Sequence, residues 1–173
     1  MNVKLVFALL VVALMTMGFD CVNDNVLVSV NVTGITGTFS LQPGGTSFDE
    51  TRTISSSDYL DVGYSDLNLN SFRVYDIQIT TIGSFNGTVN AQVLVNGAEI
   101  LSFSGPWSSF NAPQSLVSSQ LITRNPTGIL TLLNAIRNRQ DVQIRARGTV
   151  SQALPSGLSI RVDVLAQVDA VLN

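Results

Sequence analysis

Apolar and polar residues alternate with a period of two along most of the chain, which is the pattern of β-strands with one buried face. The longest run is residues 158–172, where eight apolar residues occupy every second position. Residues 142–150 show the same alternation, and a Pro-Ser-Gly turn at 155–157 favours a hairpin between the two runs. We therefore expect a long half-buried strand at the C-terminus, in an antiparallel sheet with one face on the core and one in water.

Weaker alternation predicts further strands in the N-terminal part of the chain. Residues 26–32 carry valine at every even position, and residues 35–41 and 48–54 form two more runs. The sequence QPGG at 42–45 favours a turn between these last two runs. Residues 55–70 are polar and have no clear period, so we expect a long loop there.

The middle of the chain predicts a hairpin and a bulge. Residues 88–95 and 98–103 flank Asn96-Gly97, a pair that two-residue hairpin turns prefer because both of its residues adopt positive φ. Upstream, the apolar positions change parity on either side of Tyr75-Asp76. One extra residue at that point would restore the alternation, so we expect a β-bulge there.

A single helix is predicted near residues 128–138, where apolar residues follow the spacing i, i+3, i+4, i+7. Thr127 is a candidate N-cap, and Arg137 and Arg139 suit the negative end of the helix dipole. No repeat or linker divides the chain. We predict a mainly β fold: a single antiparallel β-sandwich, similar to immunoglobulin and fibronectin domains, with one amphipathic helix.

The N-terminus has the layout of a secretory signal. Lys4 precedes an uncharged run at 5–19, which is shorter than the roughly 20 residues of a transmembrane helix. Cys21, the only cysteine, follows directly, and this arrangement resembles the lipid-attachment site of bacterial lipoproteins. The resemblance implies acylation of Cys21 and a membrane partner through that lipid. The alternatives are plain secretion after cleavage behind Gly18, and an uncut anchor. The expected division is a signal peptide at 1–20, a short tether at 21–25 and a β-sandwich domain at 26–173.

Composition excludes several classes of function. Beyond residue 20 the chain carries eight arginines, eleven acidic residues and no lysine or histidine, without a basic run, so we expect no nucleic-acid partner. The same inventory lacks the residues of serine–histidine and cysteine–histidine catalysis, of lysine Schiff bases, and of zinc sites with histidine or thiolate ligands. We therefore expect no cofactor and no enzyme activity.

The C-terminal half has a resemblance of its own. A helix, the sequence DVQIRARG at 141–148 and a closing hairpin together resemble the C-terminal half of the late-embryogenesis-abundant (water-stress) β-sandwich family. The Val-Asn-Gly turn at 95–97 is similar to the central hairpin of that family. The similarity covers at most residues 93–171 and implies a β-sandwich fold. That family has no catalytic residues to carry over.

Aromatic residues are candidates for ligand binding. Trp107 and Phe110 lie on a segment rich in Gly, Pro and Ser, and two such rings can form a platform for sugars or for a partner protein. The alternative is that both rings cap the open end of the sandwich. Tyr59 and Tyr64 lie in the polar segment at 55–70 and are further candidates for ligand contact.

Charged residues form two groups. Asp58, Asp61 and Asp66 lie close together in the polar segment at 55–70, and clustered carboxylates can chelate calcium. Their spacing does not fit an EF-hand. The alternative is that they accept hydrogen bonds from turns of the backbone. Four arginines fall within 137–147 and can form an anion site, or they complement the helix dipole and cover an exposed strand face. These are Arg137, Arg139, Arg145 and Arg147.

These features predict a non-enzymatic cell-envelope protein. We expect a structural or binding β-sandwich module, held at a membrane through Cys21 or else secreted, with an envelope protein or a glycan as partner. One alternative is a carbohydrate- or ligand-binding module that uses the Trp107 segment, which an exposed aromatic row would favour. The other is a carboxylate-based hydrolase, which two facing acids in a cleft would favour.

Overall fold

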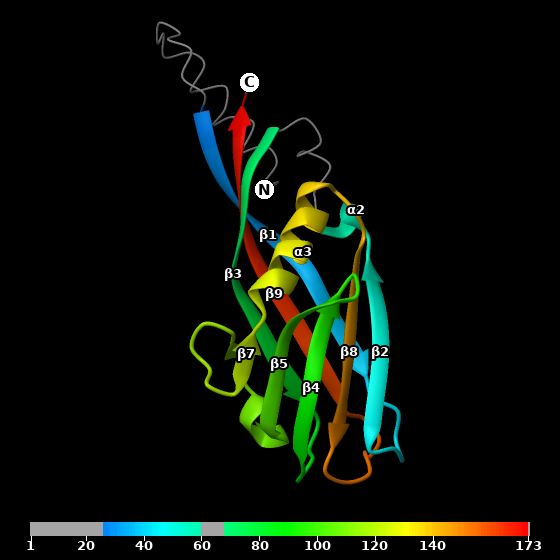
Figure 1. Cartoon of the computed structure of the whole chain (residues 1–173). Helices are drawn as coiled ribbons and strands as arrows, with labels where there is room; N and C mark the ends of the chain where they lie inside the picture. The colour runs from blue at the N-terminus through cyan, green and yellow to red at the C-terminus, as the bar shows by residue number, and fades with distance from the viewer. Residues whose placement is uncertain (1–25, 60–67, 173) are drawn as a thin grey trace, which may run out of the picture.

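Residues 26–59 and 68–172 are described by the computed structural model, which arranges them in two antiparallel sheets packed face to face (Figure 1). One sheet has the strand order β1-β9-β3-β6, and the other has the order β2-β8-β4-β5-β7. The strands are β1 (Val26–Ser40), β2 (Ser47–Ile54), β3 (Asn68–Ile82), β4 (Thr88–Val95), β5 (Ala98–Pro106), β6 (Gln114–Ser115), β7 (Ile122–Arg124), β8 (Val142–Val150) and β9 (Ser159–Leu172). The helices are α2 (Ser56–Tyr59), the 3₁₀ helix η2 (Trp107–Phe110) and α3 (Pro126–Arg137).

The strand order makes this sandwich a jelly roll. When the short β7 is set aside, eight strands form two four-stranded sheets, in which the first strand pairs with the last and the second with the next to last. This is the double Greek-key order of jelly rolls. The predicted antiparallel β-sandwich is therefore confirmed, whereas its connectivity differs from that of the immunoglobulin fold.

The hairpin predicted between residues 142–150 and 158–172 is wrong. β8 lies in the five-stranded sheet and β9 in the four-stranded sheet, so the chain crosses between the sheets at this point. Leu154 joins the segment between β8 and β9 to the QPGG turn through two hydrogen bonds of 2.9 Å. Its N–H donates to the Gly45 carbonyl, and its carbonyl accepts from the Gly44 N–H. Alternation shows which residues face the core but not which sheet a strand joins, and this explains the error.

Two N-terminal runs form a single strand. β1 is continuous from Val26 to Ser40, and its register with β9 shifts between Val32 and Ile35. The polar segment at 55–70 is only partly a loop, because it contains α2 and the beginning of β3. The hairpin of β4 and β5 turns at Asn96-Gly97, with φ of 48° and 84°, as predicted.

The predicted bulge in β3 is confirmed. The pairing of β3 with β9 shifts register between Val74 and Asp76, which leaves Tyr75 as the extra residue. The carboxylate of Asp76 closes the bulge, since it accepts hydrogen bonds from the Ile77 N–H at 2.9 Å and from the Ser115 hydroxyl at 2.8 Å. The bulge therefore also holds the short strand β6 beside β3.

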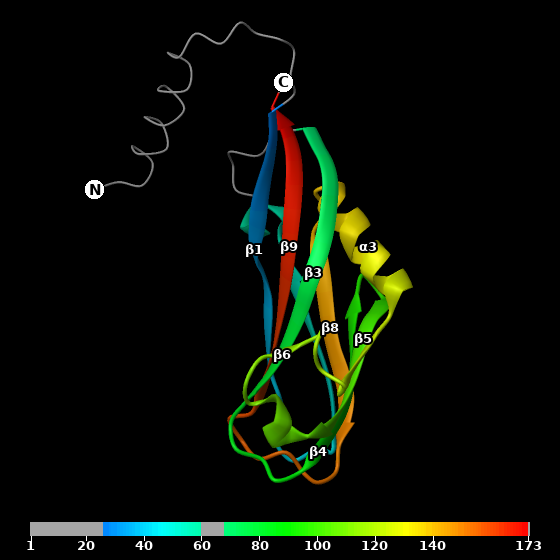
Figure 2. The same ribbon diagram turned by 90° about the vertical axis from the view of Figure 1, so that its left-hand side faces the viewer.

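Helix α3 closes one side of the core, where it packs against β5 of one sheet and β3 of the other (Figure 2). Its buried face includes Ile129, Leu132 and Ile136, as the spacing predicts. The N-cap is Asn125 rather than Thr127, because proline occupies the first helical position and the cap is the residue before it. Within the described part of the chain, none of the helices has the length and hydrophobicity that a membrane span requires.

Candidate functional site

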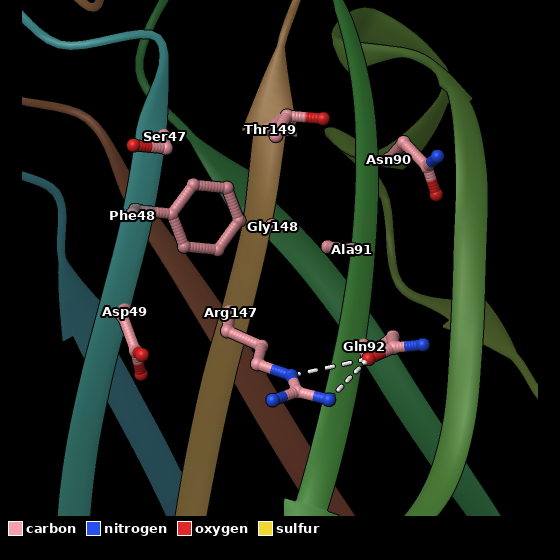
Figure 3. A pocket seen from close by; sticks show the side chains of 9 residues that line it. All are labelled: Ser47, Phe48, Asp49, Asn90, Ala91, Gln92, Arg147, Gly148 and Thr149. Atoms are coloured by element: carbon pink, nitrogen blue, oxygen red, sulfur yellow. Dashed lines mark hydrogen bonds between the residues drawn. The ribbon is translucent and has the colours of Figure 1, made fainter.

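A shallow trough of about 530 Å³ lies on the outer face of the five-stranded sheet, over β2, β8 and β4 (Figure 3). Two rows of polar residues border it, and each row runs across the three strands in register. One row is Ser47, Thr149 and Asn90, and the other is Asp49, Arg147 and Gln92. We refer to these six residues as the polar rows.

A third row of residues, which lies between the two polar rows, forms the floor of the trough. Phe48, Gly148 and Ala91 are paired across the strands, and the side chains of Phe48 and Ala91 are buried in the core. A Cβ atom on Gly148 would lie 2.5 Å from the carbonyl oxygen of Asn90 and 2.7 Å from the Cβ of Ala91. The close approach of β8 and β4 therefore requires glycine, and the floor of the trough is backbone.

The charged groups of the trough are held in different ways. The Arg145 guanidinium donates two hydrogen bonds to Asp49, one of them from Nε at 2.6 Å. This hydrogen bonding lowers the pKa of Asp49, and the same contact raises the pKa of Arg145. Arg147 instead donates from Nε and Nη2 to the Oε1 atom of Gln92, at 3.1 and 3.0 Å. A neutral amide thus orients the guanidinium that faces the trough.

The structure places Trp107 and Phe110 in the core. Both side chains are fully buried, so neither ring presents a face to a ligand, and of the two roles expected from the sequence the buried position agrees with the cap rather than with the platform. Trp107 donates from Nε1 to the Gly83 carbonyl at 3.0 Å and meets Phe85 edge to face, with ring centroids 5.7 Å apart. Phe110 contacts Phe103 in the same manner, at 5.1 Å. These rings close one end of the sandwich, where η2 follows β5.

Tyr59 is also buried, and its hydroxyl donates a hydrogen bond to the carbonyl of Gln140. Burial, and then the charge of Asp141, raise the pKa of Tyr59 to about 12.

Asp58 is exposed and accepts a hydrogen bond from the Ser55 N–H at 3.2 Å, which is the turn-stabilising role of such residues. In residues 26–59 and 68–172, no group of three or more potential ligand side chains is placed to hold a metal ion. Outside the described residues lie Cys21, Tyr64, Asp61 and Asp66.

The four arginines between residues 137 and 147 are divided between two parts of the fold and do not form a single cluster. Arg145 and Arg147 lie on the outer face of β8, whereas Arg137 is in the last turn of α3 and Arg139 follows that helix. Sequence analysis identified Arg147 and its neighbour Arg145 but missed the other five members of the polar rows. Those five stand at alternating polar positions of β2, β8 and β4, and only the pairing of strands distant in sequence shows that they are neighbours.

Two other hollows lie elsewhere on the described surface. One, of about 470 Å³, is on the outer face of the four-stranded sheet, where Arg161 Nε contacts Asp163 Oδ2 at 2.8 Å. The other, of about 200 Å³, is beside the β3 bulge and is lined by Tyr75 and Val117, whose side chains are 47% and 75% exposed. Of the three, the trough has the most extensive set of converging polar groups.

Comparison with known proteins finds similarity to solved structures only. No protein-family model matches the chain, and no curated protein sequence matches it. A chain in the structure of Desmodium yellow mottle tymovirus is similar, with 12% identity, a TM-score of 0.35, and coverage of 91% of this chain and 94% of that one. A chain of Mud crab tombus-like virus is 13% identical, with a TM-score of 0.37 and coverage of 93% and 98%. Likeness at this level carries no argument about function. The resemblance to the late-embryogenesis-abundant family stays a prediction.

Proposed function

We propose that this chain is a non-enzymatic binding module of the cell envelope, which holds a hydroxyl-rich ligand such as a glycan in the trough. The observation that carries the proposal is the pair of polar rows on either side of an open backbone floor at Gly148. The hydrolase alternative requires two facing carboxyl groups, and the trough is lined by one acid, Asp49, which is paired with Arg145.

The chemistry of the polar rows suits sugar hydroxyls. Each such hydroxyl both donates and accepts a hydrogen bond, and the rows offer both functions through hydroxyl, amide, carboxylate and guanidinium groups. Alternate residues of a strand are about 7 Å apart, so the two rows stand at a distance comparable with the breadth of a sugar ring. The charge of Asp49 is balanced by Arg145, whereas the partner of Arg147 is the neutral amide of Gln92, so the trough keeps one cationic donor for a hydroxyl or an acidic group of the glycan.

Calorimetric titration of the full chain, in a mild detergent, with a panel of soluble oligosaccharides tests the proposal. Replacement of Arg147 by alanine should weaken binding about tenfold, a change of about 1.4 kcal/mol, because the guanidinium would no longer donate to the ligand. Gln92→Ala should act in the same direction, since it releases the guanidinium from its orienting partner.

Arg161→Ala is the matched control. Arg161 is an exposed arginine on the outer face of the other sheet, and its loss should leave the affinity unchanged. Absence of binding across the panel would contradict the proposal, as would an equal loss of affinity in the Arg161 and Arg147 variants.

The envelope location is the second part of the proposal and is supported by the N-terminal sequence. Acylation of Cys21 would leave only residues 22–25 between the lipid and β1, so the domain would stand close to the membrane surface. Cys21→Ser should release the protein into the soluble fraction. Mass spectrometry of the mature N-terminus decides the question, and an unlipidated chain that begins at Phe19 would contradict it.

A further inference from the structure

The edges of the two sheets differ sharply in their protection. β2 carries three charged residues, β6 has two residues, and β7 has three residues and ends at Arg124. Where β6 does not cover β3, that strand carries Arg73 and Asp76, and α3 packs beside it. Charge and shortness are means by which proteins keep sheet edges from pairing with other chains. β1 is the exception among the described edges, because it has 15 residues with no charge and no proline.

The outer edge of β1 is not covered evenly. Near its C-terminal end, Arg52 of β2 donates a hydrogen bond of 3.2 Å to the Thr38 carbonyl. The N-terminal part, residues 26–32, pairs with β9 on its inner side, from Val26 opposite Leu172 to Val32 opposite Ala166. Helix α2 contacts β1, but no described strand pairs with the outer side of residues 26–32. Figures 1 and 2 show that this part of β1 extends with β9 and β3 beyond the five-stranded sheet.

We propose that residues 26–32 pair antiparallel with the same segment of a second copy of this chain, about a two-fold axis at Ser29. The two four-stranded sheets would then join into one continuous sheet. Such addition of a strand to an open edge is a recurring mode of recognition, in which backbone hydrogen bonds supply much of the affinity. The site is separate from the trough, so the inference does not depend on glycan binding.

The sequence of the segment, VLVSVNV, selects a second copy as the occupant. In the proposed register Val26 stands opposite Val32 and Val28 opposite Val30, so every valine meets a valine. Cross-strand pairs of β-branched residues are favourable, and no charge meets a like charge. A charged edge would repel its own copy, whereas this neutral and alternating edge complements itself, as an isologous two-fold interface requires.

Disulfide cross-linking tests the register. Ser29→Cys, in a Cys21→Ser background of the full chain in a mild detergent, should give a disulfide-linked dimer on oxidation. The two Cα atoms at the centre of an antiparallel pair stand about 4.5–5.5 Å apart, which lies within the range of a disulfide. Thr51→Cys in the same background is the matched control, because Thr51 is an exposed position on the edge strand β2 of the other sheet. That variant should give no disulfide-linked dimer.

A charge at the axis gives an independent measurement. In sedimentation equilibrium the wild-type chain should be a dimer, and Ser29→Lys should weaken its association about tenfold or more, because two lysines would face each other. Thr51→Lys should leave the dimer intact, and circular dichroism checks that both variants are folded. A monomeric wild-type chain would overturn the proposal. So would a Ser29→Cys chain that does not cross-link, or cross-linking of both cysteine variants to the same extent.

Discussion

Gly128, in the first turn of α3, lies against Glu99 of β5 so closely that a Cβ atom on it would stand 1.7 Å from the Glu99 carbonyl oxygen. The N–H of Asn125, the N-cap, donates to the Ile100 carbonyl at 2.9 Å in the same region. The first turn of the helix is thus joined to the backbone of β5 with no side chain between them. This contact sets the position of α3 at the side of the core.

Gly128→Ala should therefore destabilise the fold. In an exposed helix this change gains up to about 1 kcal/mol, but here the added methyl group overlaps the β5 backbone, and we expect a loss of about 2–3 kcal/mol. Gly97→Ala is a control for backbone strain alone, because Gly97 has a φ of 84° and no atom within 4 Å of the added carbon; it should cost about 1 kcal/mol. Urea unfolding measures both. A Gly128→Ala chain as stable as the wild type would contradict the packing described.

Trp107 should contribute to stability rather than to binding. Trp107→Ala removes a fully buried ring and should cost about 3–5 kcal/mol of unfolding free energy. Trp107→Phe keeps most of the ring but leaves the Gly83 carbonyl without its donor, so its cost should be smaller, about 1–2 kcal/mol. Thermal melts rank the two variants. If instead the alanine variant keeps its stability and loses ligand binding, the ring has a role in recognition.

Val164, near the middle of β9, is a sensitive position of the four-stranded sheet. Its side chain is 2% exposed and its strand partners are Ile35 and Ile77. Val164→Asp would bury an unpaired carboxylate among aliphatic side chains and should cost several kcal/mol, enough to unfold the domain. Arg161→Ala, on the outer face of the same strand, should change stability by less than about 1 kcal/mol. Similar melting temperatures for the two variants would mean that the inward and outward faces are reversed.

Tyr59 should make the fold sensitive to high pH. Its pKa is raised from 10.0 to about 12 in the folded chain, so above pH 10 the unfolded chain loses this proton first. The stabilisation is therefore complete below pH 10 and is lost as the pH rises to about 12. Ultraviolet absorbance of tyrosinate follows the titration. Tyr59→Phe should remove this alkaline loss, and an unchanged pH profile in that variant would assign the loss to another group.

Local structure was predictable wherever the signal lay in neighbouring residues. Asn96-Gly97 fixed a two-residue turn because of its positive φ angles, and the parity change at Tyr75-Asp76 fixed a bulge because side chains alternate strictly along a strand. The apolar stripe of α3 was equally local. The N-cap was missed by two positions because Thr127 and Asn125 both have suitable side chains, and only the placement of Pro126 decides between them.

Long-range arrangement was not predictable from the same signals. The alternation of β8 and β9 is compatible with a hairpin and also with a crossing between sheets, and only the packing of both sheets selects the crossing. The trough depends on the same kind of information, since Asp49, Arg147 and Gln92 come from three separated segments. A lone tryptophan on a Gly/Pro/Ser segment has the same sequence pattern whether it is exposed or, as Trp107 is, fully buried.

The place of β9 in the four-stranded sheet determines the order in which the chain can fold. β9, the last of the described strands, lies between β1 and β3 and pairs with both, so this sheet cannot form before β9 has been synthesised. Contacts between the two ends of a chain also slow folding, because a large loop must close before they are made. The nascent sandwich should thus stay unfolded and dependent on chaperones until β9 has left the ribosome. A translocation channel that accepts only unfolded chains would therefore meet this protein in a form that it can transport.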